Sequence, residues 1–168
     1  RPSGGRVVIA GRDATRLDDD ALTLLRRTHV GYVFQFFNLL PTLTLRENAA
    51  LPLALAGVSA KVHGERAGAL LAELGLTDQA DRYPHQVSGG QMQRAAIARA
   101  VIHAPALVLA DEPTGNLDSA TGQAILELLA RIRVERNQTI LMATHSPEAA
   151  AICDRVVRLR DGRIVADA

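Results

Sequence analysis

Two adjacent carboxylates, Asp111 and Glu112, directly follow the short apolar run Leu107–Ala110. At the end of a strand, one carboxylate can hold a hydrated magnesium ion while its neighbour orients and polarises an attacking water molecule. The segment from Pro113 to Asp118 has the composition of a turn, so the same acids are also compatible with an ordinary helix-capping turn. The pair therefore indicates either metal-assisted hydrolysis or a cap.

A second feature is the string Ser88-Gly89-Gly90-Gln91. A serine followed three residues later by glutamine is a capping box, which predicts that a helix begins here. Because glycines lack a Cβ, they leave the first amides of that helix open to close approach by a phosphate, and the helix dipole favours an anion there. A capping box alone is common. The string therefore indicates a helix start that either is merely capped or also binds an anion.

Two single polar residues follow other runs that are typical of strands. His145 comes after Thr139–Ala143, and Gln35 ends the run His29–Phe34. An imidazole can contact a terminal phosphate, and an amide oxygen can ligate magnesium or the attacking water. Taken alone, each is an ordinary polar surface residue. At the carboxyl ends of parallel strands, however, both would face the same crevice as Glu112.

The elements that must position these residues form a βαβ pattern. The apolar run Leu107–Ala110 is typical of a strand buried on both faces of a parallel sheet. Residues 119–135 predict a helix with one core-facing stripe of aliphatic side chains. That stripe consists of Ile125, Leu128, Leu129 and Ile132. Because a second strand follows at 139–143, we expect a right-handed crossover with ligand chemistry at the carboxyl ends of the strands.

The rest of the chain predicts helices flanked by short strands. Arg6–Gly11 is typical of a short strand followed by a polar loop, and Asp18-Asp19-Asp20 offers the N-cap and acidic first turn of a helix. Residues 41–104 are rich in Ala and Leu and contain no strand-like run, which indicates a helical subdomain. The tail 155–166 predicts a β-hairpin around the tight turn Asp161-Gly162.

Composition narrows the classes of function. A chain of 168 residues with 48% hydrophobic residues predicts one compact domain, and a formal net charge of +1 argues against a nucleic-acid partner. The single cysteine, Cys153, cannot form an internal disulfide, which fits a reducing compartment. No run of about 18 uninterrupted apolar residues occurs, and we expect no secretory signal at the first residues.

Taken in order, these strings resemble the nucleotide-binding domains of ABC transporters along essentially the whole chain. The resemblance implies an α/β P-loop NTPase (RecA-like) parallel-sheet core with an α-helical signature subdomain, truncated at its N-terminus. It divides residues 1–168 into the end of the N-terminal β part with the Q-loop (1–40), the helical subdomain (41–104) and the Walker B, D-loop and H-loop part (105–168). Residues 35–44 and 110–118 are similar to the branch that serves lipoprotein release, macrolide export and antimicrobial-peptide export.

The same resemblance implies ATP and Mg²⁺ as cofactors and assigns a role to each matched position. Three residues are matched to catalysis: the catalytic glutamate Glu112, the switch histidine His145 and the Q-loop glutamine Gln35. Residues matched to nucleotide binding are Ser88, Gly89, Gly90, Gln91, Asp111 and Asp118, and those matched to the metal are Asp111 and Gln35. The implied partners are a second ATPase subunit and a membrane permease that docks near Phe36 and Phe37, at the cytoplasmic face of the inner membrane. Core packing is the alternative for the two phenylalanines.

One motif of the family does not occur in these residues. The string Gly-x-x-x-x-Gly-Lys-[Ser/Thr] is absent from the 168 residues, and the family places it before the position where this sequence begins. We therefore expect these residues alone to be inactive, because the backbone amides and Lys of that loop hold the β- and γ-phosphates. The alternatives are an ABC-family ATPase of DNA repair or translation and a non-catalytic remnant.

Overall fold

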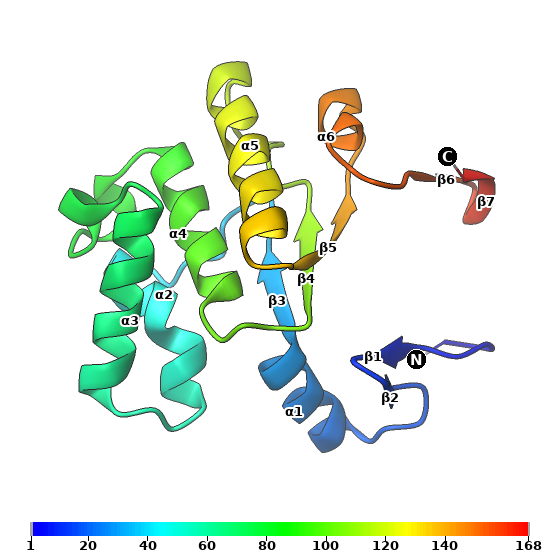
Figure 1. The fold of residues 1–168 in the computed structure, drawn as a ribbon, viewed down its shortest axis with the longest axis horizontal. Helices are drawn as coiled ribbons and strands as arrows, with labels where there is room; N and C mark the ends of the chain where they lie inside the picture. Colours follow the sequence, from blue (N-terminus) through cyan, green and yellow to red (C-terminus); the bar gives the residue numbers. More distant parts are fainter. Residues whose placement is uncertain (1, 168) are drawn as a thin grey trace.

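The computed structural model describes residues 2–167 and has a three-stranded parallel sheet at its centre (Figure 1). The strands are β3 (Val30–Val33), β4 (Leu107–Asp111) and β5 (Thr139–Ala143), in that spatial order. In the register, Val33 pairs with Ala110, and Asp111 pairs with Ala143. Helix α5 (Ser119–Glu135) connects β4 to β5, which confirms the predicted βαβ unit. All three strands therefore end at the same edge of the sheet.

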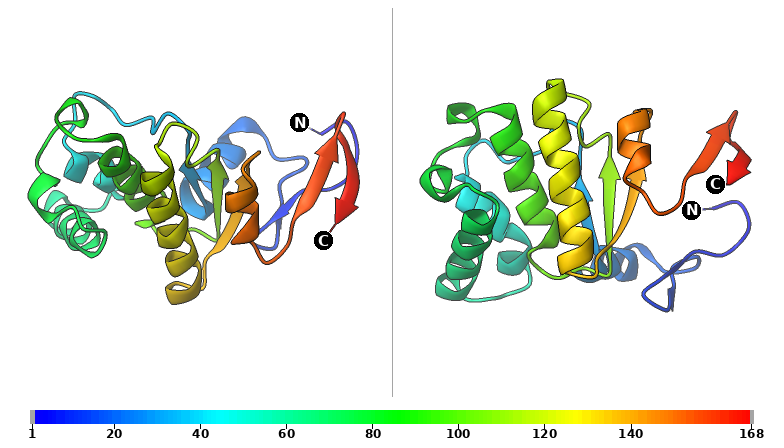
Figure 2. Two further views of the ribbon diagram at one scale, coloured as in Figure 1. Left: turned by 90° about the horizontal axis from the view of Figure 1, so that it is seen from above. Right: turned by 45° about the horizontal axis from the view of Figure 1, so that its top comes forward.

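Helices α4 (Gly89–Val101) and α5 pack on one face of this sheet, as Figures 1 and 2 show. The predicted stripe of α5 is buried against Val108 and Ala110 of β4. Helix α4 lies so close to β3 that a Cβ added to Gly31 would be 2.0 Å from the carbonyl oxygen of Ala100. A glycine is required at this contact because any larger residue would push the helix away from the strand.

The other face of the sheet contradicts one expectation. Strand β4 is not buried on both faces: Val108 and Ala110 are buried, whereas Leu107 and Leu109 are half-buried. On β5 the side chain of Leu141, which pairs with Leu109, is 61% exposed. The reason is that, within residues 2–167, both long helices of the core pack on the opposite face.

The regular elements of residues 41–104 are all helical and include no strand, as predicted (Figure 1). Helices α2 (Leu45–Leu55) and α3 (Ala60–Glu73), two 3₁₀ turns (Thr77–Gln79 and Pro84–Gln86) and α4 make up this block. Its entry is held by the fully buried side chain of Asn48. The Asn48 amide accepts from Leu40 N and donates to three carbonyl oxygens, those of Leu40, Leu43 and Thr44.

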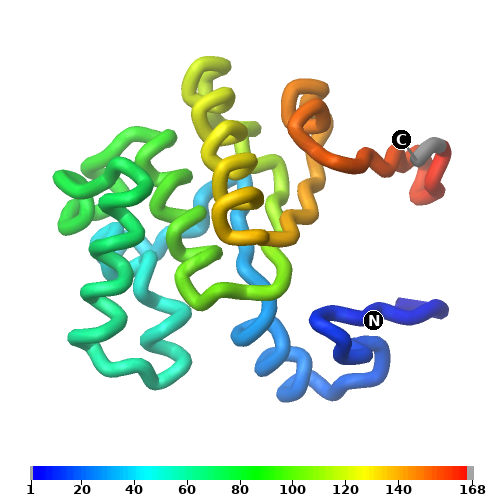
Figure 3. The backbone as a smooth tube through the Cα atoms, viewed as in Figure 1, coloured from blue at the N-terminus to red at the C-terminus, as the bar shows by residue number. Residues whose placement is uncertain are grey.

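Both ends of the described chain lie on the side of the sheet away from α2 and α3 (Figure 3). Helix α1 (Asp19–His29) has the predicted Asp18 cap. Strands β6 (Val157–Arg160) and β7 (Arg163–Asp167) form the predicted terminal hairpin, and the short α6 (Pro147–Ala151) precedes it.

The predicted polar loop after the first strand is wrong in part. Strand β1 (Val8–Ile9) pairs with β2 (Arg12–Asp13), because Ala10 and Gly11 both take a positive φ, 50° and 74°, and close a two-residue hairpin turn. Within residues 2–167, no helix is both long and apolar enough to span a bilayer.

Candidate active site

Glu112 lies at the centre of the candidate site, immediately after β4. Its backbone is in the left-handed region, with φ of 43°, and its amide donates to Ala143 O at 2.9 Å. The carboxylate turns toward the end of β5. There Oε1 accepts from His145 N at 3.0 Å and lies 2.6 Å from His145 Nδ1, while Oε2 accepts from Thr144 Oγ1 at 3.1 Å. Two neighbouring strands thus bring together the acid and the histidine that the sequence singled out.

The surroundings of Glu112 keep its carboxylate ionised. Burial opposes the charged form, but the hydrogen bonds from His145 and Thr144 outweigh it, so that the pKa of Glu112 lies below its ordinary value of 4.5. The Glu112 side chain is 21% exposed, whereas that of His145 is 86% exposed. The acid is therefore held within the site, while the imidazole ring remains open to solvent.

Gln35 leaves β3 at the same edge of the sheet and lies against the turn that follows Glu112. Asn116 Nδ2 donates to Gln35 O at 2.9 Å. A Cβ added to Gly115 would lie 2.8 Å from Gln35 Nε2, so this glycine makes room for the glutamine side chain. Glu112, His145 and Gln35 come from three adjacent strands and meet at one edge, as we expected.

Asp111 is exposed at the end of β4, and its side chain makes no hydrogen bond or ion pair among the described residues. Within residues 2–167, no group of three or more His, Cys, Asp or Glu side chains could enclose a metal ion. Mg²⁺, however, is ordinarily held by one or two carboxylates together with waters and substrate phosphates. The oxygen ligands that Asp111 and Gln35 offer fit that chemistry.

The capping box at the start of α4 is confirmed. Ser88 Oγ accepts from Gln91 N at 3.3 Å, and Gln91 Oε1 accepts from Ser88 N at 2.9 Å. The amides of Gly89 and Gly90 belong to the first turn, where a helix offers no acceptor of its own. They are therefore available to an anion.

The two glycines of the capping box also have a packing role that the sequence did not reveal. A Cβ at Gly90 would lie 2.5 Å from Thr121 Cγ2, and one at Gly89 would lie 3.2 Å from Leu117 Cδ2. A side chain at position 90 would thus displace Thr121 of α5, and one at position 89 would crowd Leu117 just before α5, whether or not a ligand approaches. Asp118 is the N-cap of that helix and accepts from Thr121 N at 3.0 Å.

No hydrogen bond or ion pair among the described residues joins the Ser88–Gln91 segment to Glu112 or His145. The predicted site residues thus fall into two groups within one chain. One group gathers at the carboxyl ends of β3, β4 and β5, and the other caps α4 and α5.

Several residues of the site were missed by sequence reasoning. Thr144 holds the second oxygen of Glu112. Gln93 and Arg99 of α4 donate to the backbone around Gln35. The available signal for Gln93 and Arg99 was the presence of long polar side chains in a helix that is otherwise rich in alanine.

The loop after Gln35 has an unusual backbone and an exposed aromatic. Phe37 and Asn38 have positive φ values of 62° and 48°, which costs roughly 1–2 kcal/mol for each residue that is not glycine. Phe36 is 71% exposed. Phe37, in contrast, is half-buried, and its Cζ lies 3.7 Å from the position that a Cβ of Gly89 would take.

Comparisons with known proteins agree with this arrangement. Residues 1–115 match the family model described as ABC transporter. An uncharacterized ABC transporter ATP-binding protein of Mycobacterium tuberculosis (strain ATCC 25618 / H37Rv) is 48% identical over 98% of this chain, and the chain spans 66% of that protein. The macrolide export ATP-binding/permease protein MacB of Syntrophobacter fumaroxidans is also 48% identical, over 98% of this chain and 23% of its own length.

A solved structure of an ATP-binding cassette has the same fold as this chain. The ATP-binding cassette MJ0796, in a dimeric post-hydrolysis state bound to ADP and Pi, superposes with a TM-score of 0.88 at 40% identity. The alignment covers 100% of this chain and 74% of that one. From its motifs, its fold and these relatives, the chain belongs to the ABC transporter family and has the fold of the family's ATP-binding cassettes.

Proposed function

We propose that the protein containing this chain hydrolyses ATP with Mg²⁺ and powers a membrane permease, in export or lipoprotein release. The contact between Glu112 Oε1 and His145 Nδ1, at 2.6 Å, carries this proposal. It supplies an ionised carboxylate and an exposed imidazole at one end of the sheet, which suits the hydrolysis of a terminal phosphate.

Each side chain has a distinct part in the proposed chemistry. Glu112 orients and polarises the attacking water, and its lowered pKa keeps it charged for this task. The His145 ring contacts the terminal phosphate, and the amide of Gln35 contacts the water or the metal. Mg²⁺ bound by Asp111 and Gln35 would neutralise charge on the phosphates.

We propose that two copies of the protein complete each other's sites. Among the described residues no hydrogen bond or ion pair joins the Ser88–Gln91 cap to Glu112 or His145, although the free amides of Gly89 and Gly90 suit a phosphate. A second copy placed head to tail would bring this cap, with Asp118 nearby, to the nucleotide. The relative MJ0796 is described as a dimer, which supports this arrangement.

The permease is proposed to dock at Phe36, with Phe37 beneath it. A 71% exposed phenylalanine next to Gln35 would place the membrane partner in direct contact with the loop that leads to the site. MacB is named as both an ATP-binding and a permease protein, which supports a permease partner. With such a partner, the proposed position of the protein is the cytoplasmic face of the inner membrane.

Glu112→Gln in the intact protein tests the proposed hydrolysis. Turnover of ATP should fall by about 100-fold or more, because glutamine cannot polarise the water as a carboxylate does. The variant should instead accumulate as an ATP-bound dimer in gel filtration. Glu127→Gln, on the outer part of α5, is the matched control and should keep normal turnover. Near-normal hydrolysis by Glu112→Gln would refute the assigned role.

A further inference from the structure

Two long polar side chains of helix α4 hydrogen-bond to backbone carbonyls close to Gln35. The first is Gln93, which is fully buried. Its Nε2 donates to Pro113 O at 2.5 Å and lies 3.5 Å from Phe34 O. Its Oε1 is buried and has no hydrogen-bond partner among the described residues. Gln93 thus supplies a donor to buried backbone carbonyls beside Gln35, at the cost of one unpaired acceptor of its own.

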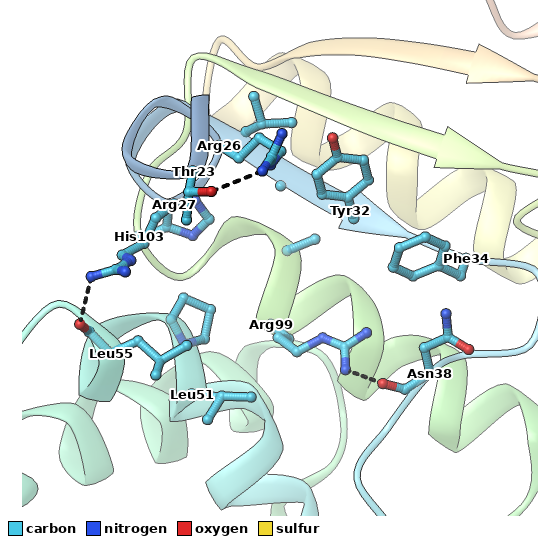
Figure 4. Close-up of a pocket in the computed structure, with 14 residues that line it drawn as sticks. Thr23, Arg26, Arg27, Tyr32, Phe34, Asn38, Leu51, Leu55, Arg99 and His103 are labelled. Atoms are coloured by element: carbon cyan, nitrogen blue, oxygen red, sulfur yellow. Dashed lines mark hydrogen bonds between the residues drawn. The ribbon is translucent and has the colours of Figure 1, made fainter. Parts of the chain in front are cut away.

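The second side chain is Arg99, six residues further along α4. Its guanidinium donates to Phe37 O at 2.8 Å and to Asn38 O at 2.5 Å, and Figure 4 shows it reaching toward Asn38. Burial lowers the pKa of Arg99, but an arginine remains charged at neutral pH, so both hydrogen bonds are charge-assisted. These two carbonyls belong to Phe37 and Asn38, the residues of this loop whose φ is positive.

The loop Phe34–Asn38 is therefore held from two sides. Gln93 and Arg99 bind its backbone from α4, while Asn116 binds Gln35 O from the turn after β4. Within Phe34–Asn38, the one large hydrophobic side chain that is strongly exposed is Phe36. Since α4 is one continuous helix that begins at the Ser88 cap, a displacement of the loop is passed to that cap over the length of the helix.

We propose that Arg99 and Gln93 are positioning residues that join the loop Phe34–Asn38 to α4, so that Gln35, Phe36 and the Ser88 cap move as one body. Neither side chain is placed to touch nucleotide. When a partner displaces Phe36, they pass that displacement to the site residues at the strand ends and to the Ser88 cap. The inference rests on the proposed ATPase function where it is tested by ATP turnover. Where it is tested by hydrogen–deuterium exchange, it rests on the geometry alone.

The kinetic test uses Arg99→Met and Gln93→Leu in the intact protein with its membrane subunits. The kcat of permease-stimulated ATP hydrolysis should fall about tenfold or more in both variants, because Gln35 is no longer held in place. The KM for ATP should stay within about twofold, since no nucleotide contact is lost. Arg99→Lys should recover part of the loss, because an ammonium carries the charge but cannot bind both carbonyls in the same fork.

Arg94→Met is the matched control on the same helix. Its Nη1 lies 3.5 Å from the position of a Cβ on Gly75, and it makes no hydrogen bond to the loop among the described residues. This variant should keep the wild-type kcat. If Arg99→Met and Gln93→Leu also keep it, or if their loss vanishes after correction for the folded fraction, the positioning role is refuted.

Hydrogen–deuterium exchange provides a second test that needs no turnover. In Arg99→Met, the amides of Phe37 and Asn38, which bond to carbonyls within the loop, should exchange about tenfold faster or more, while the amides in the middle of α4 remain protected as in the wild type. Unchanged exchange at Phe37 and Asn38 would overturn the proposal. If the wild-type protein does not hydrolyse ATP, the proposed function fails, but this exchange experiment still decides whether Arg99 holds the loop.

Discussion

Glu112 uses both carboxylate oxygens, and its partners come from the residues just beyond the neighbouring strand. His145 contributes its backbone amide and its ring, and Thr144 contributes its hydroxyl. This placement explains how a glutamate with a left-handed backbone is held in one orientation. At the residue scale, the site is a hydrogen-bonded carboxylate whose charge is favoured by its neighbours.

The lowered pKa of Glu112 predicts a pH dependence of stability. A carboxyl group whose pKa is lower in the folded than in the unfolded protein stabilises the fold above its ordinary value of 4.5, and this contribution is lost as the pH falls through the lower folded value. The difference in unfolding free energy between wild type and Glu112→Gln should therefore shrink as the pH is lowered from 7 to about 3. Urea denaturation at several pH values measures it. A difference that stays constant or grows toward acid would contradict the assignment.

At the scale of elements, α4 connects the parts of the site. It begins at the Ser88 cap, binds the Gln35 loop through Arg99, and packs against β3 at Gly31. The close approach at Gly31 fixes the height of the helix above the sheet. Because α4 packs on the strand that leads to Gln35, a shift of the helix relative to β3 would displace both the Ser88 cap and the Gln35 loop.

Gly31→Ala tests this seating. The new Cβ would lie 2.0 Å from Ala100 O, a backbone atom that cannot rotate away, so the helix must shift. We expect a loss of about 1–3 kcal/mol or more in the free energy of unfolding, measured by urea denaturation. Gly64→Ala is the matched control in α3, where a Cβ meets nothing within 4 Å. That variant should gain roughly 0.5–1 kcal/mol. Equal urea midpoints for Gly31→Ala and wild type would rule out a tight contact.

At the scale of the whole molecule, the helical block α2–α4 lies on one side of the sheet and the two hairpins lie on the other (Figure 1). The loop carrying Phe36 crosses from the sheet into the helical block. A permease bound there would contact both parts at once. The division into residues 1–40, 41–104 and 105–168 stays a prediction.

Phe36→Asp tests the proposed docking surface. A charge at a 71% exposed position should leave the unfolding temperature unchanged, but it should weaken binding to the membrane subunits about tenfold, because exposed aromatics are typical anchors of interfaces. Val134→Asp, at a position 68% exposed on α5, is the matched control and should bind normally. Binding can be measured by biolayer interferometry with the purified permease. If both variants bind as the wild type does, the permease docks elsewhere.

The sequence by itself determined the family, the strand–helix–strand order of residues 107–143 and the candidates Gln35, Glu112 and His145 at the strand ends. These features are local: capping boxes, apolar periodicity and strand-end polar residues are set by residues close together in the chain. The helix 119–135 and its buried stripe were predicted correctly for this reason.

Only the tertiary structure decided the contacts between segments far apart in the chain. Arg99 and Phe37 are 62 positions apart, and Gln35 and Asn116 are 81 apart, so no local pattern reveals that they meet. The sequence likewise did not predict that one face of β4 is only half-buried. An apolar run indicates that a strand can be buried, but it does not indicate which helices cover it. Even the glycines at 89 and 90 have a packing role that depends on where the start of α5 lies.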